Sequence, residues 1–127
     1  MFEKLELTRM AQALAAHSGA RMAVIAENVA HADTPGYKAK DLPGFAEVFA
    51  EDGTAMRATR PGHLHAASAG TTPEARRGAG HEAPNGNSVS LEAEMVKSVE
   101  ARQSHEMALA IYRATSDVIR ASLGRAR

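Results

Sequence analysis

The chain has 127 residues, which is enough for one domain. Its 15 basic and 15 acidic residues balance and are spread evenly, so no segment forms the basic patch that nucleic-acid binding requires. The chain contains no cysteine, which excludes disulfides and cysteine-based metal sites. Charged residues interrupt the N-terminus, so it is not a secretory signal, and no run reaches the length of a transmembrane helix.

Residues 3–32 are predicted to form the first helix, because apolar residues recur at helical spacing and many alanines lie between them. Asn28 lies seven residues after Arg21, in register with the apolar stripe. Two interpretations stay open for Asn28: it lies at the edge of the stripe, or it fixes the register between packed helices. The stripe consists of Leu7, Met10, Leu14, Ile25 and Val29.

A turn formed by Thr34, Pro35, Gly36 and Tyr37 is predicted to follow this helix. Pro35 disfavours helical backbone at the residue before it, and Gly36 supplies the positive φ that a type II turn needs. Residues 33–49 are therefore expected to be a turn followed by a short amphipathic segment, with residues 41–49 as a short turn or strand. The apolar members of that segment are Leu42, Phe45, Val48 and Phe49.

Residues 50–87 are rich in glycine and proline and poor in large apolar side chains. Such a segment cannot offset its ordering entropy by burial, so it is predicted to be flexible in the isolated chain, with short hairpin pieces possible near residues 54–66.

Residues 90–123 are predicted to form the second long helix. Ser90 is a suitable N-cap, and Glu92 and Glu94 lie in the first turn, where negative charge is favourable. Its stripe at near-heptad spacing consists of Leu91, Met95, Val99, Arg102, Leu109, Tyr112, Ser116, Ile119 and Leu123. The predicted fold is mainly α: one domain over residues 1–127, in which two long terminal helices pack as an antiparallel, coiled-coil-like pair around an irregular or short-β middle segment.

Both stripes are wider than one helix pair can cover, and the burial available to a single pair makes an isolated chain marginal. We therefore expect the remaining apolar surface to contact neighbouring subunits. The residues predicted for this assembly interface are Leu7, Leu14, Ile25, Val29, Leu91, Met95, Leu109, Tyr112, Ile119 and Leu123.

No catalytic, cofactor or metal site is predicted. His63 and His65 have no cysteine or carboxylate cluster to complete a metal site, so they are interpreted as solvated loop residues. Ser104, His105 and Glu106 are contiguous on a helix, so their side chains point in different directions and cannot form a catalytic relay. The sequence gives no support for an enzyme.

Two stretches resemble the axial proteins of the bacterial flagellum, and in particular the FlgB family of proximal rod subunits. The first runs from Asn28 to Lys38 and continues through Lys40, Asp41, Leu42 and Phe45; it contains the motif residues Asn28, Thr34, Pro35, Gly36 and Tyr37. The second is the entry to the last helix, residues 86–95. Ser90 stands where the family often has Asp, which keeps an N-cap.

The resemblance implies a non-enzymatic subunit, without cofactor, of the proximal rod in the flagellar basal body. Such subunits are exported by the flagellar type III apparatus without a cleaved signal. They assemble helically, which helps to connect the export apparatus and MS ring to the rest of the rod and to transmit torque. The implied partners are copies of the chain itself, FlgC and related rod proteins, FliE and the type III export gate, with no nucleic acid or small-molecule substrate.

Two alternatives stay open. The first is FlgC, although the longer middle domain expected of that relative is missing here. The second belongs to another class, a small cytoplasmic helical adaptor or chaperone. Such a protein would need neither the Thr34–Tyr37 turn nor an ordered apolar stripe on the last helix.

Overall fold

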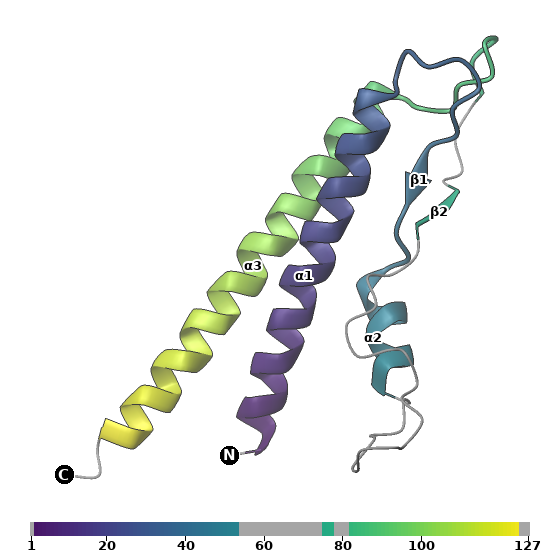
Figure 1. Ribbon diagram of the computed structural model, residues 1–127. Coiled ribbons are helices and arrows are strands. Elements are labelled where there is room, and N and C mark those ends of the chain that lie inside the picture. The colour runs from purple at the N-terminus through teal and green to yellow at the C-terminus, as the bar shows by residue number, and fades with distance from the viewer. Residues whose placement is uncertain (1, 54–74, 78–81, 125–127) are drawn as a thin grey trace, which may run out of the picture.

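The computed structural model describes residues 2–53, 75–77 and 82–124. The described chain is mainly helical, and its elements follow the order α1 (Phe2–Ala30), β1 (Lys40–Asp41), α2 (Phe45–Gly53), β2 (Arg76–Arg77) and α3 (Leu91–Gly124). The two long helices pack against each other and separate toward the N- and C-terminal ends, and the segment with β1 and α2 runs back beside α1 (Figure 1).

Both long helices lie close to their predicted ranges. The first was predicted over residues 3–32 and ends at Ala30, because the chain turns there: the Thr34 amide donates to the His31 carbonyl. The second was predicted over residues 90–123 and covers Leu91–Gly124. Its N-cap is Ser90, whose carbonyl accepts from the Glu94 amide at 2.9 Å.

The α1–α3 interface is built from small side chains. On α1 the buried residues Ala11, Ser18 and Ile25 recur every seven residues. On α3 a second heptad series is buried in the same way and consists of Glu94, Ala101, Ala108 and Thr115. Heptad spacing keeps one face of each helix toward its neighbour, and alanine and serine let the two backbones approach closely.

Contacts between side chains fix how the two helices are aligned. Asn28 near the end of α1 meets Glu94 near the start of α3. Arg21 lies near Glu100, and the Ala15 carbonyl contacts the ring of His105. The N- and C-terminal ends of the described chain lie at the same end of the molecule (Figure 1).

The segment after the turn is held against α1 by β1 and α2. The helix α2 begins after Gly44, whose carbonyl accepts from the Glu47 and Val48 amides. The Phe45 ring packs edge-on against His17 of α1, with 5.8 Å between ring centroids, and Phe49 packs against Phe45. The prediction of a short turn or strand over residues 41–49 was therefore wrong for most of this segment, because the residues from Phe45 form a helix that continues to Gly53.

Much of the segment predicted to be flexible, residues 50–87, lies outside the described residues. Its described parts take part in the fold. Arg76 and Arg77 form β2, which pairs antiparallel with β1 in the register Lys40 with Arg77 and Asp41 with Arg76. Near its end, the Gly86 amide donates to the Ala83 carbonyl at 2.8 Å. In the part of the chain that the structure describes, no helix is long and apolar enough to cross a membrane.

Candidate functional site: a polar network at the α1–α3 junction

A buried polar network lies where the end of α1, the β1 strand and the start of α3 meet. Its central residue is Asn28, with 0% of its surface exposed. The Asn28 Nδ2 donates to the Lys40 carbonyl at 2.7 Å and to Glu94 Oε2 at 3.0 Å. Its Oδ1 accepts from the Lys40 amide at 3.0 Å and from the Tyr37 hydroxyl at 3.3 Å. One side chain thereby connects α1, β1 and α3.

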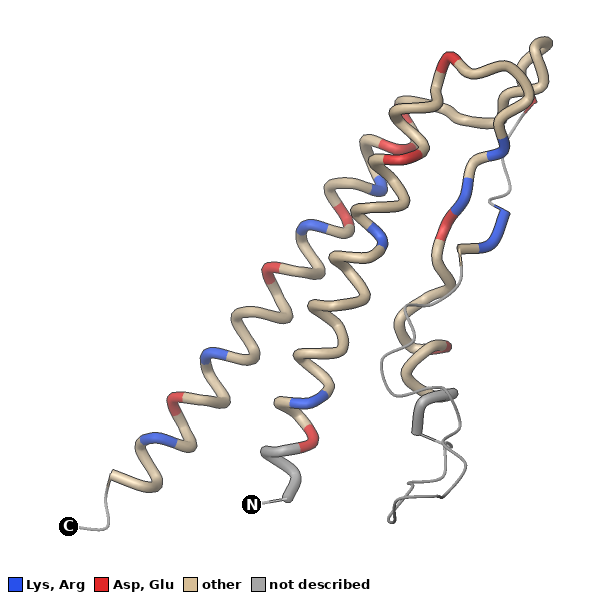
Figure 2. Tube along the Cα trace, in the orientation of Figure 1, with Lys and Arg blue, Asp and Glu red and all other residues tan. Residues whose placement is uncertain are grey.

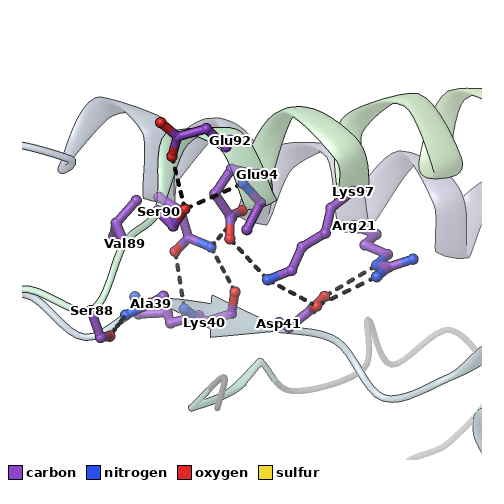
Figure 3. A network of polar contacts seen from close by, with 12 residues as sticks. Arg21, Ala39, Lys40, Asp41, Ser88, Val89, Ser90, Glu92, Glu94 and Lys97 are labelled. Carbon is purple, nitrogen blue, oxygen red and sulfur yellow. Dashed lines mark hydrogen bonds and ion pairs between the residues drawn. The ribbon is translucent and has the colours of Figure 1, made fainter. Parts of the chain in front are cut away.

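Two cations extend this network along the helix pair (Figure 3). Arg21 of α1 forms an ion pair with Asp41, with 3.1 Å between Nε and Oδ1. Lys97 of α3 lies between two carboxylates, 2.9 Å from Glu94 Oε1 and 3.4 Å from Asp41 Oδ2. Glu94 is only 1% exposed, and its two oxygens are satisfied by Asn28 and Lys97. A buried carboxylate is stable only when it is paired in this way.

The network changes the proton affinity of Asp41 and Lys97. Burial alone would raise the pKa of Asp41. The Arg21 hydrogen bond and charge, the Leu42 amide and the Lys97 charge outweigh burial, so this pKa lies below its ordinary value of 3.8. For Lys97, burial alone would lower the pKa, but Glu94 and Asp41 together raise it above 10.5. Both groups are therefore charged at neutral pH.

A second buried amide closes the end of α1. Asn87 Nδ2 donates to the carbonyls of Ala32 at 2.7 Å and of His31 and Thr34 at 3.0 Å. Its Oδ1 accepts from the Val89 amide at 2.7 Å. These three carbonyls lie in the turn that follows Ala30, so a residue far along the chain holds this turn in place.

Two glycines bring the turn and the α3 entry together. Gly36 has a φ of 73° and Gly86 a φ of 78°, both in the left-handed region. The Tyr37 amide donates to the Thr34 carbonyl at 3.3 Å, so the predicted turn has the hydrogen bond and the positive φ of a type II turn. A Cβ at Gly86 would lie 3.5 Å from Gly36 Cα, which shows how closely the two backbones pass.

The five motif residues from Asn28 to Tyr37 and the entry to α3 are thus parts of one junction. Asn28 lies at its centre, and Tyr37 is half-buried and stacks on His31 at 4.5 Å between ring centroids. Thr34, Pro35 and Gly36 form the exposed turn above it. Of the two interpretations of Asn28, these contacts favour the one in which it fixes the position of packed elements.

The residues predicted for an assembly interface take different positions. Ile25 is buried in the α1–α3 interface, and Leu14, Leu109 and Ile119 are half-buried. The other six are exposed: Leu7, Val29, Leu91, Met95, Tyr112 and Leu123. The large apolar side chains of both helices therefore lie mostly beside the interface between them, and not within it.

The described histidines contact backbone carbonyls or neighbouring rings. His17 contacts the Pro43 carbonyl at 2.9 Å and His105 the Ala15 carbonyl at 3.2 Å, so both hold elements together. His63 and His65 lie outside the described residues. Within residues 2–53, 75–77 and 82–124, no group of three or more His, Asp or Glu side chains could hold a metal ion.

Sequence reasoning did not predict the structural roles of Glu94, Asn87 and Asp41. Glu94 was assigned to the first turn of α3, where negative charge is favourable, and Asn87 to the flexible middle segment. One feature of the sequence does point to these residues: all three lie in the two stretches that resemble flagellar axial proteins.

The chain matches no family model, and no curated protein is significantly similar to it.

Proposed function

We propose that this protein is an axial subunit of the bacterial flagellum, built to assemble with copies of itself and with related subunits. Within that class, the two motif stretches favour a proximal rod subunit of the FlgB type over FlgC. On this proposal it has no enzymatic activity and occupies the periplasmic part of the basal body, reached by type III export without a cleaved signal.

The observation that carries the proposal is the junction around Asn28. The two stretches that resemble rod proteins are separated by the 40 residues 46–85, yet they share direct hydrogen bonds. Examples are those from Asn28 to Glu94 and from the Ser88 amide to the Tyr37 carbonyl at 3.0 Å. Because the two stretches form one physical unit, the junction, we take their resemblance to rod proteins as support for the proposal.

The distribution of apolar side chains gives further support. The helix pair buries mainly small residues and leaves large ones exposed, among them Met95 and Val99 with 67% of their surface accessible. Exposed apolar surface of this kind is typical of interaction sites. We propose that α1 and α3 form an antiparallel, coiled-coil-like pair, and that its outer surfaces contact other subunits.

The test is a deletion of the gene in its own host. We expect loss of swimming and loss of basal-body rods, both restored by the intact gene, and a tagged copy that purifies with basal bodies. The partners FlgC, FliE and the export gate are tested by cross-linking in the same preparation. If the deletion strain swims normally and the tagged chain stays in the cytoplasm, the adaptor or chaperone alternative is favoured instead.

A further inference from the structure

The helix α3 carries a second heptad face beside the one that packs on α1. Its positions follow a strict spacing of four and three residues, and they are Leu91, Met95, Ser98, Arg102, His105, Leu109, Tyr112, Ser116, Ile119 and Leu123. We call these ten residues the outer face of α3. The charge along α3 is otherwise mixed in sign (Figure 2), but Arg102 is the single Lys, Arg, Asp or Glu in this face.

The outer face is accessible in the described structure. Leu91, Met95, Tyr112 and Leu123 are exposed, and none of the residues of β1 or α2 packs on it. The segment from Lys40 to Gly53 contacts α1 at His17. The outer face contacts α1 elsewhere, where His105 meets the Ala15 carbonyl, so this segment and the outer face use different parts of α1. Six of the ten residues of this face are apolar, and Arg102 is its one Lys, Arg, Asp or Glu, which suits a surface for another helix.

The order of residues along the outer face reads nearly the same in both directions. If a second copy is turned antiparallel about a point near residue 107, Leu91 lies opposite Leu123, and Met95 lies opposite Ile119. Every other pair is also compatible: Ser98 with Ser116, Arg102 with Tyr112, and His105 with Leu109. Arg102 would then meet an aromatic ring, a favourable cation–π pair.

The charges beside the outer face distinguish this arrangement from a parallel one. In the antiparallel pair, Glu92 lies near Arg120 of the second copy, so opposite charges meet twice. In a parallel pair, Arg102 would lie against Arg102 in the centre of the interface. Like charges in register are costly, and in coiled coils such contacts decide helix orientation. At the two-fold axis Glu106 meets its own copy, where its ion pair with Arg102 at 3.1 Å offsets the repulsion.

We infer that the outer face of α3 binds a second copy of this chain, forming an antiparallel dimer related by a two-fold axis. Such an interface is isologous, because the same surface is used by both copies and each residue pair occurs twice. The inference does not depend on the proposed function. A rod requires subunits that all point the same way, so this dimer would be a form that exists before assembly and must dissociate to assemble.

The first experiment measures the dimer and its location. Light scattering with size-exclusion chromatography of the full chain is expected to give the mass of a dimer. Met95→Glu should weaken dimerisation at least tenfold. Met107→Glu is the matched control, because Met107 is also an exposed methionine, at 51%, but lies on the opposite side of α3 from the outer face; its effect should stay within twofold. Circular dichroism verifies that both variants keep their helices.

The second experiment tests orientation, and the absence of cysteine from the chain makes it simple. We expect chains with Ser98→Cys to form disulfides efficiently with chains carrying Ser116→Cys, and neither variant to cross-link with itself. Self-linking of Ser98→Cys would show a parallel pair and overturn the inference. A monomer at every concentration, or an open-ended polymer, would overturn it too; the polymer would leave the proposed rod function intact.

Discussion

Gly36 is the residue at which backbone geometry matters most. Its φ of 73° is strained for a residue with a side chain. Gly36→Ala should therefore reduce the free energy of unfolding by about 1–2 kcal/mol. Gly19→Ala is the control, since this glycine lies within α1 with no atom near the added Cβ, and the change should stabilise the protein by about 0.5–1 kcal/mol. Urea unfolding measures both, and equal effects would mean that the turn tolerates a side chain.

Asp41 makes the stability of the polar network depend on pH. Its pKa is lower in the folded chain than in the unfolded chain, so its ion pairs stabilise the fold fully above the ordinary value of 3.8. This contribution is lost as the pH falls from about 4 through the lower pKa of the folded state. The melting temperature of the intact chain should therefore decline below about pH 4.

The variant Asp41→Asn distinguishes the contribution of Asp41 to this pH dependence from that of the other carboxylates. The variant should melt at a lower temperature than the intact chain at pH 7, because Arg21 and Lys97 lose a charged partner. The difference between the two melting temperatures should narrow as the pH falls below about 4, because the ionised form of Asp41 is then progressively lost. A constant difference between them from pH 7 to pH 3 would show that the pKa of Asp41 is not lowered by folding.

At the scale of elements, the helix ranges were predictable and the interface between the helices was not. Heptad analysis detects large apolar side chains, so it selected Leu91, Met95 and Leu109. The structure instead buries Ala101 and Ala108, which carry little hydrophobic signal, and places the large residues beside them. Sequence periodicity shows that a helix has an apolar face, but close packing of backbones favours small residues.

The polar network was beyond sequence reasoning for a different reason. Asn87 is buried because carbonyls more than fifty residues earlier need a donor, and Glu94 because Asn28 and Lys97 surround it. No local pattern around either residue contains this information. The turn at Gly36 was predictable, since its requirements lie within four consecutive residues.

The small-residue interface makes a prediction about packing. Ala108 is 0% exposed, so Ala108→Leu must push α1 and α3 apart, and the free energy of unfolding should fall by about 1–3 kcal/mol. Ala110→Leu adds the same atoms at an exposed position of α3 and should change stability by less than about 0.5 kcal/mol. Chemical unfolding of the two variants decides, and a neutral Ala108→Leu would mean that the helices are not closely packed there.

At the scale of the whole molecule, two long helices are joined at one end (Figure 1), and both carry exposed large apolar side chains. The junction around Asn28 fixes how α1, β1 and α3 are placed relative to each other. The same contacts leave the outer surfaces of the helices available. The molecule therefore separates two kinds of side chain. Polar groups that need hydrogen-bond partners lie inside the junction, and large apolar side chains, which gain most from losing contact with water, lie on the outer surfaces.

If the apolar surface of α3 is used for assembly, a charge introduced on it should abolish the proposed function. Leu109 is half-buried on α3, so Leu109→Glu would place a charge where assembly removes water, at a large cost in free energy. Expressed in a strain that lacks the gene, the variant should be made in normal amounts but fail to restore swimming in soft agar. Gln103→Glu, at an exposed position of the same helix, introduces the same charge and should swim normally. If Leu109→Glu swims as well as Gln103→Glu, the apolar surface of α3 is not an assembly surface.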